Sequence, residues 1–304
     1  MPELPEVHTT ATMLDRLARG CVIHGVWTDY DSAFNRGKSN IKDRKYFKLL
    51  KKTITGKKII GVRRRAKNVL IDLSSNVTIL IHMKMTGHIL YGKYEKASVV
   101  KKEIWKTLEK GPLEDPFNQF IHFVLTLDNG KHVALSDVRK FAKVLFFETN
   151  APPENLLELG PEPLEREFSL KKFIERLSLR QKGKIKQVLL DQTVIAGIGN
   201  IYSDESLWYS KIHPESRVER IPHDILSNLF TSVKHVLRDA INSGGDSLSD
   251  YRNPRGEKGG YQNFHKAYQQ TGKKCRRARC GGTIRRIIIG GRSGHFCDTH
   301  QKKY

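Results

Sequence analysis

Residues 1–6 (MPELPE) combine the residue types that covalent catalysis by an amine requires. If Met1 is removed, Pro2 becomes a terminal secondary amine. An α-amino group has a pKa near ~7.7–8.0, against ~10.4 for a lysine side chain, so more of it is unprotonated at neutral pH. Such an amine can attack a carbonyl-like carbon and form an iminium, a Schiff base. Glu3 would stand beside it as an acid or base, with Glu6 on the same helical face.

The same six residues also make a good first turn of a helix. Proline tolerates the first helical position, and carboxylates stabilise the positive end of the helix. On these residues alone, this structural interpretation is the better one. The rest of the chain changes the balance.

Four potential metal ligands lie in the C-terminal tail, spaced as Cys-x4-Cys and Cys-x2-His: Cys275, Cys280, Cys297 and His300. Ligand pairs at either end of a hairpin are typical of a tetrahedral zinc site. Residues 283–289 and 292–296 would form the hairpin strands. So small a zinc hairpin is a scaffold, which predicts a structural metal. It would hold Arg292 near its tip, where a guanidinium can bind phosphate.

Two further segments have residues suited to binding phosphate. Residues 197–200 (GIGN) stand between two short helices, and backbone amides before a helix suit a DNA phosphate. Lys182, Lys184 and Lys186 lie just upstream, although a solvated helix face would explain them equally well. Residues 63–67 (RRRAK) are expected at the edge of a strand pair, where most such runs contact phosphate non-specifically.

Two kinds of residue in the first half could take part more directly. Lys67, inside the basic run, could transfer a proton if it faces a reacting centre. Met85, Arg139 and Phe141 end or follow strands, and a methionine and a phenylalanine on loops could hold open a base stack. Taken singly, Met85 and Phe141 are better explained as core residues.

The charge of the chain indicates a polyanionic partner. Lysine and arginine number 54 against 32 acidic residues among 304, a net charge of +22, which favours nucleic acid. A membrane surface is disfavoured, since there is neither a long apolar run nor a basic amphipathic helix. We expect no signal peptide. Cys21 stands alone and the other cysteines share the tail, as in an intracellular protein.

The apolar pattern predicts an α+β fold. Residues 5–19 read as an amphipathic helix, and residues 74–76 and 128–130 as hairpin turns. Two stretches read as surface insertions: residues 31–50, and residues 92–117, which have a short helical pattern. Seven strands suggest a β-sandwich, and they are expected at 22–27, 57–65, 68–73, 77–83, 120–127, 131–137 and 143–148.

The second half reads as helical, with a mobile loop at residues 246–263 that shows no periodicity. A proline-rich stretch separates the two halves. The expected organisation is an N-terminal catalytic β-sandwich with flanking helices, a linker, a helical DNA-binding domain with a helix–two-turn–helix, and a zinc β-hairpin: residues 1–149, 150–166, 167–264 and 265–304.

Taken together, the motifs resemble the formamidopyrimidine-DNA glycosylases of the Fpg/Nei family, almost from end to end. The N-terminal PELPEV matches the formamidopyrimidine branch, whereas the endonuclease VIII branch has PEGPE. RRRAKNVLIDL, HMKMTGHI, LSDVRKFAKV, KIKQVLLDQTVIAGIGNIYSDESLWYSKIHP and the zinc hairpin follow in family order.

The resemblance implies catalytic roles for five residues. Pro2 would be the Schiff-base nucleophile, Glu3 would protonate the opening sugar, and Glu6 would support them. Lys67 matches the lysine assigned as proton donor in β-elimination. Arg292 matches the zinc-finger arginine linked to DNA binding and δ-elimination.

The resemblance also implies DNA contacts. Met85, Arg139 and Phe141 match the trio that fills the gap left by an extruded nucleotide. Asn200 and Lys186 match phosphate contacts of the helix–two-turn–helix, and Lys182 would be a basic contact upstream of them.

The chain departs from the family pattern in three places. The first cysteine pair is Cys-x4-Cys where relatives have Cys-x2-Cys, and His300 stands where they have a final cysteine. Asn118 occupies the position of a DNA-contacting histidine. The insertions at 31–50 and 92–117 are longer than expected and have no assigned role.

The resemblance implies a bifunctional DNA glycosylase and AP lyase of base excision repair. It would remove oxidised purines (8-oxoguanine and formamidopyrimidines) through a Pro2 Schiff base with β,δ-elimination. We expect one structural Zn2+, damaged double-stranded DNA as partner, no membrane, and a monomer located with intracellular DNA (cytoplasmic and nucleoid-associated if bacterial).

Three alternatives remain open. The chain could prefer oxidised pyrimidines, as endonuclease VIII does. It could be a catalytically inactive DNA-binding relative, for which an intact Met1 blocking the amine would be the sign. A basic zinc-hairpin protein that binds RNA or ribosomes is the third, but it leaves PELPE and the Met85/Arg139/Phe141 trio unexplained.

Overall fold

The computed structural model describes residues 1–99 and 102–304. Chain contacts divide it into two compact units. Unit 1 comprises Met1–Leu156 and Ser243–Gly260, and unit 2 comprises Leu157–Asn242 and Tyr261–Tyr304. The first boundary falls in the expected linker. The other division differs from the expected one, because residues 243–260 return to unit 1 and the C-terminal hairpin shares unit 2 with the helices.

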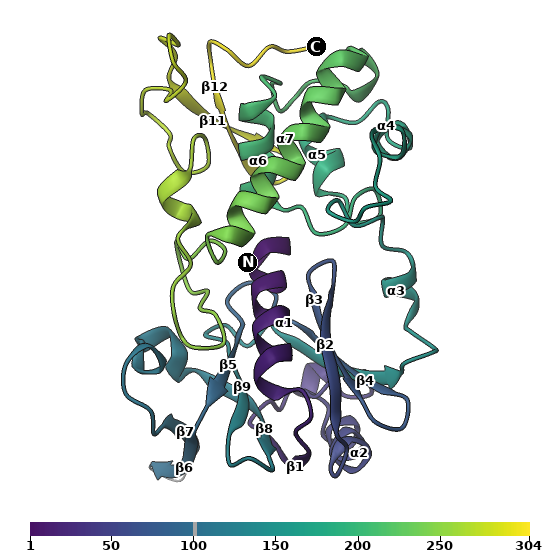
Figure 1. Cartoon of the computed structure of the whole chain (residues 1–304), viewed down its shortest axis with the longest axis vertical. Coiled ribbons are helices and arrows are strands. Elements are labelled where there is room, and N and C mark those ends of the chain that lie inside the picture. The colour runs from purple at the N-terminus through teal and green to yellow at the C-terminus, as the bar shows by residue number, and fades with distance from the viewer. Residues whose placement is uncertain (100–101) are drawn as a thin grey trace. The chain divides into compact units, whose positions relative to one another are not determined.

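Unit 1 is a sandwich of two four-stranded antiparallel sheets, with orders β1-β8-β9-β5 and β10-β4-β3-β2. The α+β class and the sandwich are confirmed, and all seven predicted strands are present (Figure 1). The eighth strand, β5, was not predicted. The strands are β1 (Ile23–Thr28), β2 (Ile59–Arg65), β3 (Asn68–Leu73), β4 (Val77–His82), β5 (His88–Gly92), β8 (Ile121–Leu127), β9 (His132–Ser136) and β10 (Lys143–Glu148).

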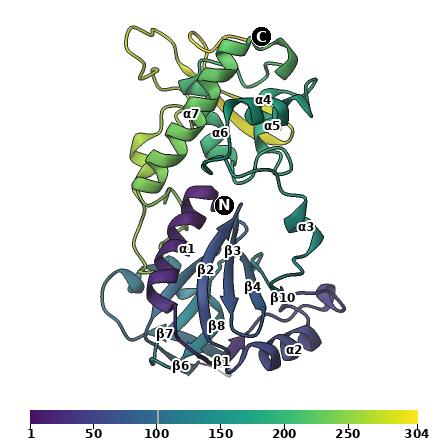
Figure 2. The same ribbon diagram turned by 45° about the vertical axis from the view of Figure 1, so that its right-hand side comes forward.

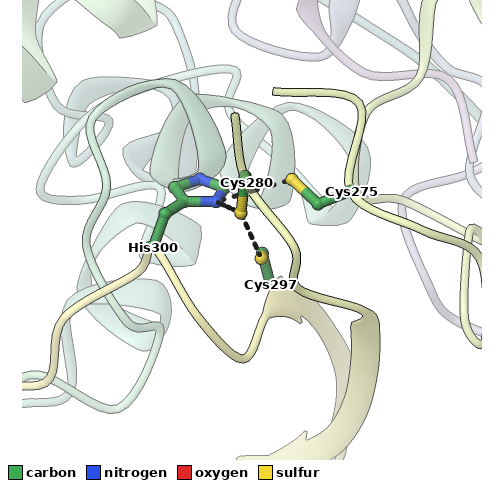
Figure 3. Close-up of side chains that lie close together, drawn as sticks. All are labelled: Cys275, Cys280, Cys297 and His300. Carbon is green, nitrogen blue, oxygen red and sulfur yellow. Dashed lines mark hydrogen bonds between the residues drawn. The ribbon is translucent and has the colours of Figure 1, made fainter. Parts of the chain in front are cut away.

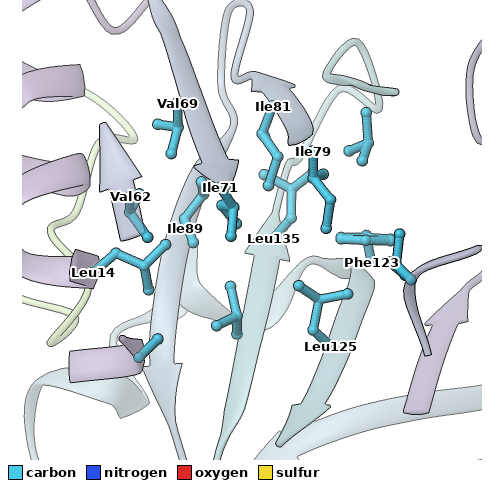
Figure 4. Packing of buried hydrophobic residues seen from close by; sticks show 14 of the residues in the cluster. Leu14, Val62, Val69, Ile71, Ile79, Ile81, Ile89, Phe123, Leu125 and Leu135 are labelled. Atoms are coloured by element: carbon cyan, nitrogen blue, oxygen red, sulfur yellow. The ribbon is translucent and has the colours of Figure 1, made fainter. Parts of the chain in front are cut away.

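The core of unit 1 lies between the two sheets and beneath helix α1 (Leu4–Ala18). Figure 4 shows Ile71 and Ile79 of one sheet facing Phe123 and Leu135 of the other, with Leu14 of α1 beside them. All five side chains are at most 1 % exposed. The alternation of apolar residues along the strands produces this arrangement, because successive side chains point to opposite faces.

The two insertions differ from their prediction as surface segments. The first contains helix α2 (Arg44–Ile54) and sends Ile41 and Leu50 into the core, where both are fully buried. The second forms a hairpin of β6 (Tyr94–Val99) and β7 (Lys102–Thr107), followed by short 3₁₀ helices at Pro112–Glu114 and Pro116–Gln119. Its many charged side chains hid the strand periodicity.

Residues 246–260, expected to be mobile, are fixed to unit 1 by side-chain hydrogen bonds. The Tyr251 hydroxyl donates to the backbone carbonyl of Glu6 at 3.0 Å, and the Ser247 hydroxyl donates to the carbonyl of Tyr251 at 2.7 Å. Arg252, only 2 % exposed, forms two hydrogen bonds with the carboxylate of Asp115. Polar anchoring of this kind has no periodicity, so the apolar pattern could not predict it.

Unit 2 contains the predicted helices and the C-terminal hairpin (Figure 2). Helix α6 packs against α5, α7 and β12, so one helix joins the hairpin to the bundle. No helix in the described part of the chain is both long and apolar enough to cross a bilayer. The elements are α3 (Glu154–Leu157), which crosses the unit boundary, then α4 (Leu170–Ser178), α5 (Ile185–Leu190), α6 (Asn200–Tyr209), α7 (His223–Asn242), β11 (Ile284–Ile289) and β12 (Arg292–Cys297).

Candidate functional site

Two carboxylates define the N-terminal end of α1. Glu3 is the residue that caps the helix, and its backbone N–H donates to Glu6 Oε2 at 2.7 Å. The other oxygen, Glu6 Oε1, accepts from the backbone N–H of Asp246 at 2.8 Å. Glu3 and Glu6 are both 2 % exposed. Glu6 therefore holds the backbone next to Pro2.

The course of β2 places Lys67 at the same end of α1. The N–H of Gly20, just past the helix, donates to the carbonyl of Ile59 at 2.8 Å, and the N–H of Val62 donates to Asp15 Oδ1 at 2.7 Å. Strand β2 thus runs back along the helix towards its start. From Val62 to Arg65, where β2 ends, a strand advances about 10 Å, the length of about seven helical residues.

Counted from Asp15, that length reaches about His8, in the N-terminal half of α1, and the turn after β2 begins there. Figures 1 and 2 agree, since both show the turn between β2 and β3 near the N-terminus of α1. Lys67 lies in this turn and is 7 % exposed. Two of the arginines before Lys67 form contacts within unit 1. Arg63 pairs with Asp72 at 2.7 Å, and Arg64 Nη1 donates to the carbonyl of Ala66 at 3.1 Å.

His82, at the end of β4, is a residue of this region that the sequence analysis did not single out. Burial, together with the positive charges of Lys84, Lys67 and Lys143, lowers the pKa of His82 to about 3. The ring is therefore neutral at physiological pH, and its Nδ1 accepts from the backbone N–H of Lys84 at 3.0 Å. A sequence signal existed, because His82 begins the HMKMTGHI motif.

The three predicted wedge residues lie on two adjoining turns. Met85 follows β4 and is 40 % exposed. Phe141, which lies between β9 and β10, is 48 % exposed, and the guanidinium of Arg139 stands 4.6 Å from the centre of its ring. The N–H of Arg139 donates to the Thr86 hydroxyl at 3.1 Å, which links the two turns. A side chain that inserts into DNA must be exposed, whereas a core side chain would be buried.

Asp137, a second residue that the sequence analysis missed, fixes both turns. It is fully buried; its Oδ1 accepts from the Thr86 hydroxyl, and its Oδ2 accepts from the N–H of Ala142 at 2.7 Å and the Tyr30 hydroxyl at 3.2 Å. Its neighbours along the chain, Arg139 and Phe141, were recognised. The positioning role could not be seen because Thr86 and Tyr30 are remote in sequence.

In unit 2 the glycine-rich turn leads directly into α6, and its residues Gly197, Ile198 and Gly199 are buried. Gly199 caps the helix and Asn200 is its first residue. Gly197 has φ 91°, a conformation that favours glycine. The side chain of Gln192 braces the turn by accepting from the N–H of Gly197 at 2.9 Å and donating to the carbonyl of Ile198 at 2.8 Å.

Lys182, in the segment before α5, is exposed. Lys182 thus has the exposure that a phosphate contact requires, and a phosphate contact by Asn200 stays a prediction.

Two residues that were predicted to contact DNA are buried in the structure. Lys186 is fully buried and forms an ion pair with Asp204, whose other oxygen accepts from the backbone N–H of His295 at 3.0 Å. Asn118, 2 % exposed, bonds to His88 Nε2 at 2.9 Å and donates to the carbonyl of Pro112 at 2.8 Å. Both polar groups are satisfied within their own unit, so we assign them structural roles.

The four tail residues form a compact ligand set (Figure 3). Their donor atoms lie within 4.8 Å of one another, with Cys280 Sγ 3.6 Å from Cys297 Sγ and 3.5 Å from His300 Nδ1. Tetrahedral zinc with bonds of about 2.0–2.3 Å needs ligand separations of roughly 3.5–3.8 Å. The Nε2 of His300 lies 3.2 Å from the carbonyl of Trp208. If Nε2 carries the proton and donates to that carbonyl, Nδ1 is left for the metal.

The prediction of one structural zinc site is thus confirmed. His300 offers the fourth donor atom of the cluster, and we propose it as the fourth ligand. The metal would tie the ends of β11 and β12 together, and Arg292 begins β12 with its side chain exposed. A structural site of this kind stabilises the fold and takes no part in the chemistry.

Purified protein should contain one zinc ion per chain, and replacing His300 should loosen it. His300→Cys keeps a ligand and should retain stoichiometric zinc, whereas His300→Ala should release zinc to a competing chelator at least tenfold faster. Metal analysis with a chelator titration measures both. Stoichiometric, equally tight zinc in His300→Ala would contradict the assignment.

Comparison with known proteins covers both units. Residues 1–144 match the model for the formamidopyrimidine-DNA glycosylase N-terminal domain, and residues 159–252 match that for the formamidopyrimidine-DNA glycosylase H2TH domain. Residues 272–299 match a zinc finger found in FPG and IleRS. The three matches follow the order of the motifs in the chain.

Full-length relatives agree. A formamidopyrimidine-DNA glycosylase of Herpetosiphon aurantiacus is 36 % identical, covering 99 % of this chain and 100 % of its own. The crystal structure of a complex of LlFpg with a THF-DNA and an inhibitor superposes with a TM-score of 0.81 at 32 % identity, over 99 % of this chain and 100 % of that one. The complex of Lactococcus lactis Fpg with DNA containing an abasic site gives 0.79 at 31 % identity, over 97 % of each.

These matches confirm the resemblance, the fold and the zinc hairpin, and with them damaged DNA as the partner. They span essentially the whole chain. The chain belongs to the formamidopyrimidine-DNA glycosylase family, and it is a DNA glycosylase of base excision repair with AP lyase activity.

Proposed function

We propose that the chain excises oxidised purines from duplex DNA with Pro2 as its nucleophile, and then cleaves the strand at the resulting abasic site. The observation that supports this most is the placement of groups at one end of α1. Glu6 fixes the backbone beside Pro2 through its bond to the N–H of Glu3, and the Lys67 turn lies at that same end (Figure 1). We further propose that it works as a monomer on intracellular DNA, in the cytoplasm if bacterial.

The reaction begins with extrusion of the damaged nucleotide, because the sugar cannot be attacked inside the duplex. Extrusion costs a few kcal/mol. Insertion of Met85 and Phe141 into the gap, with Arg139 beside Phe141, offsets this cost. The net charge of +22 supplies attraction for the phosphate backbone. Asn200 and Lys182 are the proposed phosphate contacts of unit 2.

The covalent steps follow from the amine. The lone pair of the Pro2 nitrogen attacks C1′, the bond from C1′ to the base breaks with its electrons on the base, and Glu3 protonates the ring oxygen of the sugar as it opens. The product is an iminium between Pro2 and C1′. The iminium acidifies the C2′ proton, so its removal expels the 3′ phosphate, and a second elimination expels the 5′ phosphate. Lys67 carries a proton to the departing base, and Arg292 binds phosphate during the second elimination.

The preference for oxidised purines rests on the resemblance and on the segment after α7. Gly245 (φ 87°) passes so close to Glu6 that a Cβ at this position would lie 2.9 Å from Glu6 Oε1. The Asp246 N–H bond and the buried Arg252 hold the rest of the segment against unit 1. This fixed segment lies beside the catalytic carboxylates, so it can contact the extruded base and favour one shape of base over another.

A panel of duplexes that each carry one lesion tests this preference. The zinc-loaded protein is mixed with DNA containing 8-oxoguanine, a formamidopyrimidine, an oxidised pyrimidine or undamaged guanine, and borohydride reduces the iminium to a stable adduct. We expect the two purine lesions to give at least tenfold faster trapping than the oxidised pyrimidine, and undamaged guanine to give none. Faster trapping on the pyrimidine lesion would establish the endonuclease VIII-like specificity instead.

A further inference from the structure

The first insertion is attached directly to the turn that carries Phe141. The amine of Lys42 donates to the carbonyl of Lys140, and the N–H of Ile41 donates to the carbonyl of Val144 at 3.2 Å. Lys140 in turn pairs with Asp29 at 3.0 Å. Direct hydrogen bonds therefore link the insertion to the wedge turn within unit 1.

An open cavity of about 550 Å³ lies between the insertion and this turn. Pockets that take a ligand of about nucleotide size range from about 300 to 1,000 Å³. Its lining combines three aromatic rings with three amines: Tyr30, Phe34 and Phe141, and Lys42, Lys84 and Lys140.

Two of the three aromatic side chains, Phe34 and Phe141, are exposed, whereas Tyr30 is buried. Phe34 is 81 % exposed, and the amine of Lys38 stands 3.7 Å from the centre of its ring. Phe141 is 48 % exposed. Exposed rings beside cations are the means by which proteins bind unpaired bases, because every base has a π face that can stack.

The charge of the cavity favours an anion. The one acidic residue in its lining, Asp31, is paired with Arg44. Burial lowers the pKa of Lys42 and of Lys84, and neighbouring lysines lower both further, although Asp137 opposes the effect at Lys42. A phosphate oxygen near these amines would stabilise their charged form.

We propose that this cavity binds one nucleotide of the undamaged strand at the wedge, with its base on Phe34 and its phosphate at the lysines. The inference rests on the proposed function for the location of the wedge. When the damaged nucleotide leaves the duplex, the base opposite loses its pairing partner and its neighbours lose a stacking surface. Phe34, beside Phe141, provides a replacement surface on the strand that stays intact.

The experiment uses 2-aminopurine, whose fluorescence falls when it stacks. The probe is placed opposite a stable abasic analogue, at each neighbouring position of the undamaged strand, and at the matching positions of the damaged strand. Full-length, zinc-loaded wild type is compared with Phe34→Ala and with Phe34→Tyr, which keeps a ring. Leu49→Ala is the matched control, because Leu49 is 53 % exposed on the same insertion but does not line this cavity.

In wild type we expect a fluorescence change on binding at one position of the undamaged strand. Phe34→Ala should lose it and bind about tenfold more weakly, the scale of one lost base–aromatic stack, whereas Phe34→Tyr and Leu49→Ala should behave as wild type. Equal affinity and equal fluorescence for Phe34→Ala at every position would overturn the proposal, as would a change confined to the damaged strand.

The same proteins are also tested by borohydride trapping on DNA with a true abasic site. Phe34→Ala should still be trapped at saturating enzyme, because Phe34 is not the nucleophile. Failure of wild type to trap would refute the role of Pro2, while the fluorescence result would still decide the role of the cavity.

Discussion

Covering the N-terminal amine should abolish lesion-dependent trapping while leaving DNA binding intact. A protein that retains one extra residue before Pro2 carries an amide nitrogen there, and an amide has no lone pair available to attack C1′. The extra residue leaves the wedge residues and the phosphate contacts unchanged. The affinity for DNA with a stable abasic analogue should therefore remain within about twofold. Borohydride trapping on 8-oxoguanine duplexes and a binding titration measure the two properties.

The matched control is the same extended protein after a protease has removed the extension and exposed Pro2. Trapping should return, since the chain is otherwise identical. Undiminished trapping by the extended protein would exclude Pro2 as nucleophile. Loss of binding together with trapping would mean that the extension disturbs the start of α1, where Glu3 caps the helix, and the smaller substitution Pro2→Gly would then be compared for its trapping rate.

Removing the amine of Lys67 should change the ratio of the two activities. Lys67→Ala should slow base release from 8-oxoguanine by about 10²–10⁴-fold where its proton transfer limits the rate, and slow cleavage at a preformed abasic site by much less. Abasic DNA already carries an aldehyde at C1′ and has no base to release, so the step that needs Lys67 does not occur on it. Single-turnover rates at saturating enzyme on both substrates give this ratio.

Lys182→Ala serves as the comparison, because Lys182 is an exposed lysine with a proposed phosphate contact. It should weaken binding equally on both substrates and lower the salt slope by about one, with no change in the ratio at saturation. If Lys67→Ala behaved in the same way, Lys67 would be a phosphate contact and not a proton carrier.

The sequence predicted well the features that depend on residues close together in the chain. The zinc ligands Cys275 and Cys280, and Cys297 and His300, form two short pairs, and their four donor atoms do meet. The predicted strands of unit 1 are short runs rich in apolar residues, and all seven exist. The turn at residues 74–76 contains Ser75 and Asn76 with φ of 61° and 58°, as a tight hairpin requires.

The features that could not be predicted depend on partners remote in sequence. Lys186 matches a phosphate contact by its motif, but Asp204 neutralises it in the interior. Asn118 stands at a DNA-contacting position, but His88 binds its side chain. The segment around Arg252 has no periodicity, and its order comes from Asp115, which lies in an insertion. In each case a polar group is satisfied by a residue that spacing alone cannot identify.

The central claim is that the amine of Pro2 forms the covalent bond to DNA, and mapping the reduced adduct tests it most directly. The wild-type protein is trapped on an 8-oxoguanine duplex with borohydride, digested, and analysed by mass spectrometry. The account predicts that the sugar-derived mass is carried by the peptide that begins at Pro2, with Met1 absent. Finding it on a lysine, above all on Lys67, or on a chain that still begins with Met1, would contradict the account.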